Sequence, residues 1–127
     1  MCKFLVKIST VLYLLSLIAC STIYNRESTV YLPIGATRGT AERIADSLWK
    51  DNFVQKISDK FPNFNPLKNP QTQGIYLFYP LVPSPESEIF IRLTIYYTGK
   101  LDNAEEIIKY GKTIVQKAVE DYFKNKI

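Results

Sequence analysis

Histidine is missing from this chain of 127 residues, and its absence removes several kinds of catalytic site. Without imidazole there is no Ser-His-Asp or Cys-His apparatus, no histidine-bound zinc and no imidazole acid–base catalysis. The five glycines stand singly, so there is no glycine-rich loop to cradle a phosphate. A Ser-Lys pair or two carboxylates remain as catalytic alternatives, but no pattern in the sequence indicates a pocket around such groups. The sequence therefore predicts a protein that is not an enzyme, with no cofactor and no metal.

A strong excess of one charge is also absent. The chain has 16 Lys and Arg against 12 Asp and Glu, and the lysines are scattered rather than clustered. Nucleic-acid binding needs a basic patch or stripe, which this pattern does not provide. We therefore expect no nucleic-acid partner.

The N-terminus has the layout of a secretory signal. Lys3 and Lys7 precede an apolar stretch from Val11 to Ile18, which is too short to span a bilayer of roughly 30 Å. This stretch ends in Leu17-Ile18-Ala19-Cys20, which resembles the lipobox of bacterial lipoprotein precursors. An ordinary signal peptide cut near Ala19, or an uncleaved anchor helix, is the alternative interpretation.

The resemblance implies where the protein works. Residues 1–19 would be removed as the signal peptide, and Cys20 would carry diacylglycerol and further acyl chains such as palmitate. Several chains anchor a protein durably, whereas a single chain is marginal. Ser21 stands where Asp would retain a lipoprotein in the inner membrane of enteric bacteria. The expected location is therefore the outer membrane, facing the periplasm.

Cysteines contribute nothing to the stability of the mature protein under this interpretation. Cys2 would leave with the signal peptide and Cys20 would be acylated, so no thiol is left to pair. The stretch from Cys20 to Ile127 contains 127 − 19 = 108 residues, which fits one domain. That domain must be stabilised by its core alone.

The segment after Cys20 is polar, and we interpret residues 20–28 as a short lipidated tether. A single domain, residues 29–127, is expected to follow. Its first strand is predicted over Thr29–Leu32, where β-branched and aromatic residues alternate until Pro33.

A helix is predicted next, with Thr40 as its N-cap and its end near Phe61. The apolar side chains of this helix change from one helical face to another around Asp51 and Asn52, which indicates a bend there. Prolines then interrupt any helix and predict an irregular connector. These prolines are Pro62, Pro66 and Pro70.

A hairpin follows, because the apolar period changes to two. Alternation runs over Gly74–Tyr79 and again over Glu88–Thr98, with prolines 80, 83 and 85 marking the turn between. A last helix is predicted from Ala104 to about Tyr122, after capping signatures that begin at Asp102 and Asn103.

The resulting order is β-α-β-β-α, an α+β two-layer sandwich. We expect a three-stranded mixed sheet with helices on one face. The first strand should run parallel to the second, because a helical crossover joins them.

Strand alternation predicts a second, aromatic face on this sheet. The aliphatic side chains of the three strands share one parity and should meet the helices. The opposite parity carries Tyr31, Tyr76, Phe78, Phe90, Arg92, Thr94 and Tyr96. Tyr, Phe and Arg are enriched in recognition surfaces, so this face is the candidate partner-binding site. The alternative is that the aromatic pairs only stabilise the sheet, or that the proline-rich connector covers them.

Two functions from different classes fit these observations. The first is a non-catalytic envelope lipoprotein that acts as a protein-interaction or assembly module of an outer-membrane machine. The alternative is a periplasmic immunity or exclusion lipoprotein that neutralises a toxin, lysozyme or phage component. A third, weaker interpretation is a glycan or peptidoglycan binder that stacks sugars on Tyr76, Phe78 or Tyr96. The oligomeric state is left open.

Overall fold

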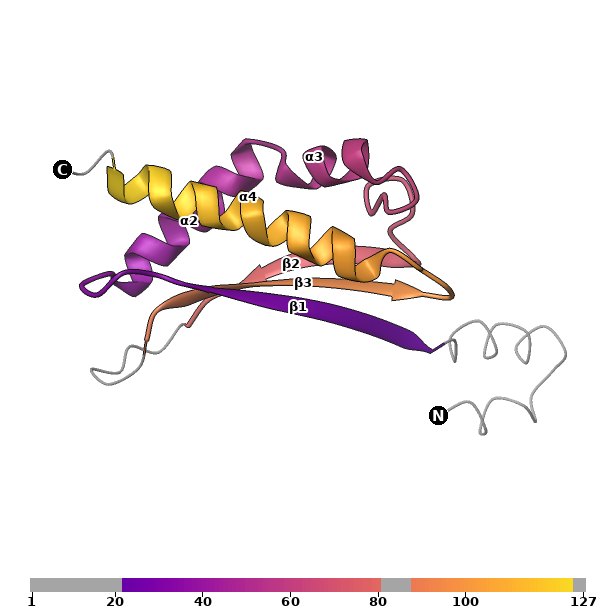
Figure 1. Cartoon of the computed structure of the whole chain (residues 1–127), viewed down its shortest axis with the longest axis horizontal. Coiled ribbons are helices and arrows are strands. Elements are labelled where there is room, and N and C mark those ends of the chain that lie inside the picture. Colours follow the sequence, from indigo (N-terminus) through magenta and orange to yellow (C-terminus); the bar gives the residue numbers. More distant parts are fainter. Residues whose placement is uncertain (1–21, 81–87, 125–127) are drawn as a thin grey trace, which may run out of the picture.

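A computed structural model describes residues 22–80 and 88–124 of the chain (Figure 1). The expected signal peptide, Cys20 and most of the predicted hairpin turn lie outside these ranges. The described part is an α+β fold with three strands, as expected, but it has three helices where two were predicted. In chain order the elements are β1 (Ile23–Tyr31), α2 (Arg38–Lys50), α3 (Phe53–Lys60), β2 (Gln73–Phe78), β3 (Phe90–Thr98) and α4 (Ala104–Lys124).

The sheet is antiparallel and not mixed, which corrects the prediction. Its strand order is β1-β3-β2, and both outer strands run antiparallel to β3. β1 and β2 therefore do point the same way, but β3 lies between them. Alternation alone does not say whether β1 pairs with β2 or with the free edge of β3, and it is this choice that decides the sheet type.

β1 begins six residues earlier than the predicted first strand at Thr29. Residues 23–28 were expected to lie in a flexible tether, and this is wrong, because they pair with β3 from Ile23↔Thr98 to Ser28↔Leu93. Residues 23–27 are all exposed, so the alternation of buried and exposed side chains that reveals a strand is missing here. Pairing with the backbone of β3 therefore holds these residues in the strand conformation.

The predicted long helix is divided into α2 and α3 at the expected place. Asn52 adopts a left-handed conformation with φ 56°, which ends the first helical segment and redirects the chain. The N-cap is Thr37 and not Thr40. The Thr40 N–H donates to Thr37 Oγ1, and the Thr37 N–H donates to Thr40 Oγ1, each at 3.2 Å. Threonine at both positions closes the capping box three residues earlier than predicted.

Figure 1 shows the three helices on one side of the sheet. α4 packs against β1 and β3, and it also contacts α2 and α3. Gly111 of α4 is buried over β3, where a Cβ atom would overlap Leu93 Cδ2. The helix axis can therefore lie close to the sheet. The largest fully buried side chains are Phe53, Phe64, Ile44, Ile57, Ile91, Leu93, Ile95, Ile107 and Val115.

Within the described part of the chain, one buried polar side chain has no hydrogen-bond partner. The Ser58 hydroxyl on α3 is buried and makes no hydrogen bond within the described residues. We expect Ser58→Ala to leave the free energy of unfolding unchanged or to raise it by up to about 1 kcal/mol, because an unpaired buried hydroxyl only adds a desolvation cost. Urea denaturation measures this.

Ser47→Ala is the matched control, since the Ser47 hydroxyl donates to the Ile44 carbonyl at 2.8 Å. That variant should lose a little stability. A clear loss in Ser58→Ala would mean that its hydroxyl has a partner, such as a buried water.

Candidate interaction surface

The predicted aromatic residues lie together on the sheet face opposite the helices. The register aligns Tyr31 with Phe90 in β3, and it aligns Phe78 with Arg92 on the other side. No described helix or strand covers this face in Figure 1. We call it the outer aromatic face, and it consists of Tyr31, Tyr76, Phe78, Phe90, Arg92 and Tyr96.

Four of its rings are open to solvent. Tyr31 is 60% exposed, Tyr76 48%, Phe78 43% and Tyr96 37%, whereas Phe90 and Arg92 are half-buried. Thr94 shares this face but is only 4% exposed, so it does not belong to the accessible surface as expected. Its short side chain stands beside the much larger Tyr76 on the neighbouring strand.

The rings pair across neighbouring strands in two groups, Tyr31–Phe90–Phe78 and Tyr76–Tyr96. The Phe90 ring centroid lies 6.0 Å from that of Tyr31 and 6.0 Å from that of Phe78. The Tyr76 and Tyr96 centroids are 6.1 Å apart. These separations are typical of attractive aromatic pairs, which also stiffen the sheet.

Arg92 lies among the rings. Its guanidinium carbon is 5.0 Å from the Phe90 centroid and 5.5 Å from the Phe78 centroid. Its Nε donates a long hydrogen bond of 3.5 Å to Thr29 Oγ1. Within residues 22–80 and 88–124, no carboxylate forms an ion pair with Arg92. The face therefore presents a cation that is held in place by aromatic contacts.

Gly74 supports this face in a way that the sequence did not reveal. A Cβ atom at Gly74 would overlap the ring of Tyr96, which lies directly opposite in β3. The Tyr96 ring therefore rests on the bare backbone of β2. Tyr96 is more firmly seated than Tyr31, Tyr76 or Phe78.

A second surface feature lies at the end of the sheet where β1 begins. It is an open depression of about 570 Å³. Its lining residues are Thr22, Tyr24, Arg26, Tyr97, Gly99, Lys100, Leu101 and Asp102. The sequence did not reveal it, because three of these eight residues lie in the supposed tether and only the β1–β3 pairing brings the two groups together.

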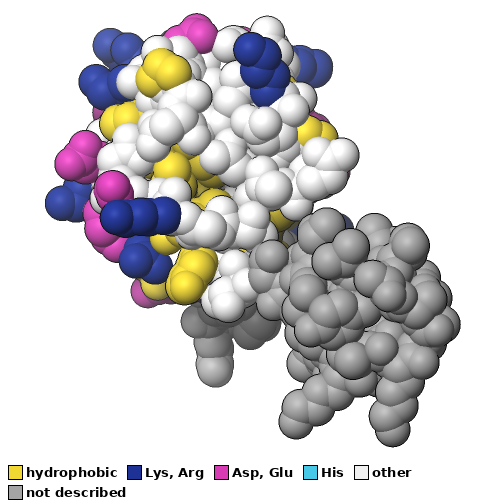
Figure 2. All heavy atoms as spheres, turned by 90° about the vertical axis from the view of Figure 1, so that its right-hand side faces the viewer, with side chains coloured by type: hydrophobic (Ala, Val, Ile, Leu, Met, Phe, Trp, Pro, Cys, Tyr) yellow, Lys and Arg dark blue, Asp and Glu magenta, His cyan; other side chains and the backbone are white. Residues whose placement is uncertain are grey.

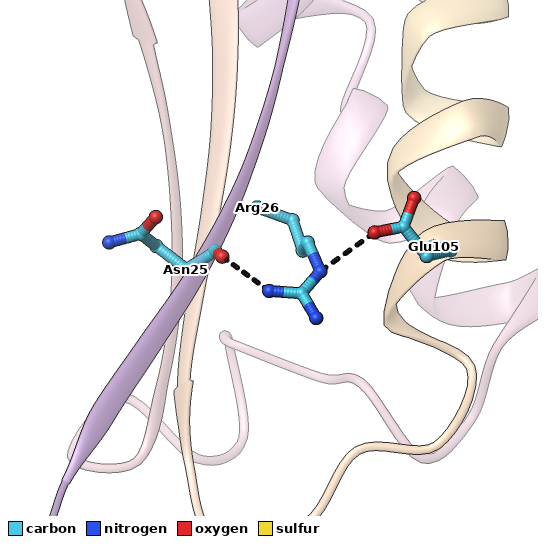
Figure 3. Close-up of polar contacts among 3 residues, drawn as sticks. All are labelled: Asn25, Arg26 and Glu105. Atoms are coloured by element: carbon cyan, nitrogen blue, oxygen red, sulfur yellow. Dashed lines mark hydrogen bonds and ion pairs between the residues drawn. The ribbon is translucent and has the colours of Figure 1, made fainter.

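The charges around this depression are balanced. Arg26 Nε lies 2.8 Å from Glu105 Oε1 on α4, and its Nη1 donates to the Asn25 carbonyl at 3.0 Å (Figure 3). Lys100 Nζ lies 3.8 Å from Asp102 Oδ1. Both ion pairs are exposed and contribute little to stability. Together they give the depression no net charge.

The described residues contain no group of three acidic side chains placed to hold a metal ion. None of the described helices has the length and apolar character needed to cross a membrane. A scan against protein-family models, and searches of curated proteins and of solved structures, found no match to this chain. We therefore infer function from these surfaces.

Proposed function

We propose that this protein is a non-catalytic, lipid-anchored envelope protein that binds a protein partner through the outer aromatic face, as an assembly module of an outer-membrane machine. The observation that carries the proposal is the face itself, which the described helices and strands leave open and which displays four exposed rings and Arg92. Large contiguous apolar patches are uncommon on monomers and are typical of interaction sites. The lipobox-like segment ending at Cys20 supports the envelope location.

The arrangement of Arg92 favours a protein partner with a carboxylate in its interface. Phe78 and Phe90 hold the guanidinium in position, so little side-chain entropy is lost on binding. No carboxylate of the described residues pairs with this guanidinium, which can therefore bind a carboxylate of a partner in a bidentate way, while the surrounding rings exclude water from the contact. Aromatic and arginine side chains are the usual hot spots of protein interfaces.

The test uses the double variant Tyr31→Ser with Phe78→Ser. We expect it to lose a partner that the unmodified protein captures from its own envelope after mild crosslinking. The fold should survive, because the cross-strand ring pairs contribute about 2 kcal/mol at most. Tyr96 is left intact, since its ring covers Gly74. Circular dichroism monitors folding, and mass spectrometry identifies the captured protein.

Ile34→Ser is the matched control, because Ile34 is a fully exposed apolar residue that is not one of the six residues of this face. It should capture the partner as the unmodified protein does. Equal capture by the double variant would contradict the proposal and place binding elsewhere. Capture of no resident envelope protein by any form would favour the immunity alternative, in which the partner is an incoming toxin, lysozyme or phage protein.

A further inference from the structure

Only two residues, Ser21 and Thr22, separate Cys20 from the first strand of the domain. β1 begins at Ile23, three residues after Cys20, and Ile23 is already paired with Thr98. Three fully extended residues span at most about 11 Å. A lipid on Cys20 would therefore hold the first residue of β1 within about 11 Å of the anchored cysteine.

The surface at this end of the sheet suits a water–lipid boundary. Ile23 is 64% exposed, and the half-exposed Tyr24 ring stacks on Tyr97 with centroids 5.7 Å apart. Figure 2 looks onto this end and shows several hydrophobic side chains among polar and backbone atoms, with most charged side chains at the left and upper edges. Tyrosine is enriched at membrane interfaces, because its ring is apolar and its hydroxyl is polar.

We propose that this end of the domain, with Ile23, Tyr24 and the depression beside them, contacts the headgroup layer of the bilayer, so that the strands run roughly along the membrane normal. The inference rests on the lipid anchor of the proposed function. Because Arg26 and Lys100 are balanced by Glu105 and Asp102, the contact does not require anionic lipid. Tyr31, at the other end of β1, then stands roughly 27 Å farther out, at ~3.4 Å per residue.

The experiment uses the full-length, lipidated protein in liposomes of phosphatidylcholine and phosphatidylethanolamine. A fluorophore is attached to Ile23→Cys, to Lys100→Cys or, beyond the far end of β1, to Ile34→Cys. Lipids with a nitroxide on the headgroup quench fluorophores near the membrane surface. We expect quenching at positions 23 and 100 to be several-fold stronger than at position 34, and unchanged when phosphatidylglycerol is added.

A spacing variant provides the control. An insertion of about 20 Gly and Ser residues between Ser21 and Thr22 gives a flexible reach of roughly 25 Å, which should abolish the difference between the two ends. Equal quenching at both ends without the insertion, or a difference that needs anionic lipid, would overturn the orientation. Mass spectrometry of the same sample separates the two proposals. If Cys20 carries no diacylglycerol, both the proposed lipid anchor and this orientation are overturned. If Cys20 is acylated but quenching is equal at the two ends, only the orientation is overturned.

Discussion

Replacing Phe64 by alanine is expected to lower the free energy of unfolding by about 3–5 kcal/mol. Phe64 lies between α3 and β2, in a segment without regular secondary structure, yet none of its side chain is exposed. Removal of the ring leaves a cavity in the main core, which the surrounding side chains fill only in part. Because a domain of this size has a total stability of about 5–15 kcal/mol, the variant would be close to unfolding.

Urea denaturation followed by circular dichroism measures this loss. Leu67→Ala is the matched control, because Leu67 lies three residues further along the same segment and is 66% exposed. That control should change the free energy of unfolding by no more than about 0.5 kcal/mol. Similar effects for the two variants would show that the segment does not anchor to the core through Phe64.

The second large effect is expected at Gly111, where α4 crosses β3. Gly111→Val should destabilise the protein by about 3 kcal/mol, at the upper end of the usual cost of overpacking. Even a Cβ atom here overlaps Leu93, which is itself 1% exposed and therefore packed in the core. Gly39→Val tests whether valine in a helix is costly by itself, since a Cβ at Gly39 makes only an ordinary contact with Thr37 at 3.6 Å.

A double variant tests the cause. Leu93→Ala removes three carbon atoms at the point where Gly111→Val adds three, so total core volume is conserved. Alone, Leu93→Ala should cost about 2–5 kcal/mol. Combined, the two changes should cost clearly less than the sum of their separate effects. Additive losses in urea denaturation would mean that Gly111 and Leu93 do not compete for the same space.

The elements with strong periodicity were predictable. β2, β3 and α4 all lie close to their expected bounds, because each has one face buried against the core and one face outside. The division of the first long helix near Asn52 was also visible, as a slip in the apolar stripe. In these segments, burial and local conformational preference indicate the same structure.

Other features depend on contacts that a local pattern does not contain. The first half of β1 has exposed side chains on both faces, so only its pairing with β3 makes it a strand. Phe64 looks like one residue of a proline-rich connector, although it is fully buried. Both cases are tertiary effects, in which a distant segment supplies the partner.

The candidate site was predictable in its composition but not in its detail. Strand parity placed the six residues of the outer aromatic face correctly on one side of the sheet. The alternation of side chains shows on which face of a strand a residue lies, but not how deeply it is buried. Thr94 lies on the outer aromatic face, yet it is buried among the larger side chains beside it. The contact of Tyr96 with Gly74 and the position of Arg92 between two rings depend on cross-strand register.

The central place of β3 in the sheet has a consequence for the order of folding. Every strand pairing involves β3, although β3 is the last strand in the sequence, and Ile23 is separated from its partner Thr98 by 75 positions (98 − 23). The entropy cost of closing such a long loop comes before the free energy gained from strand pairing, so contacts of this kind form slowly. In a chain exported N-terminus first, β1 is therefore the first strand to emerge and must wait for the last one. If Cys20 is lipidated as proposed, its processing would take place while the neighbouring strand is still unpaired, before the sheet closes.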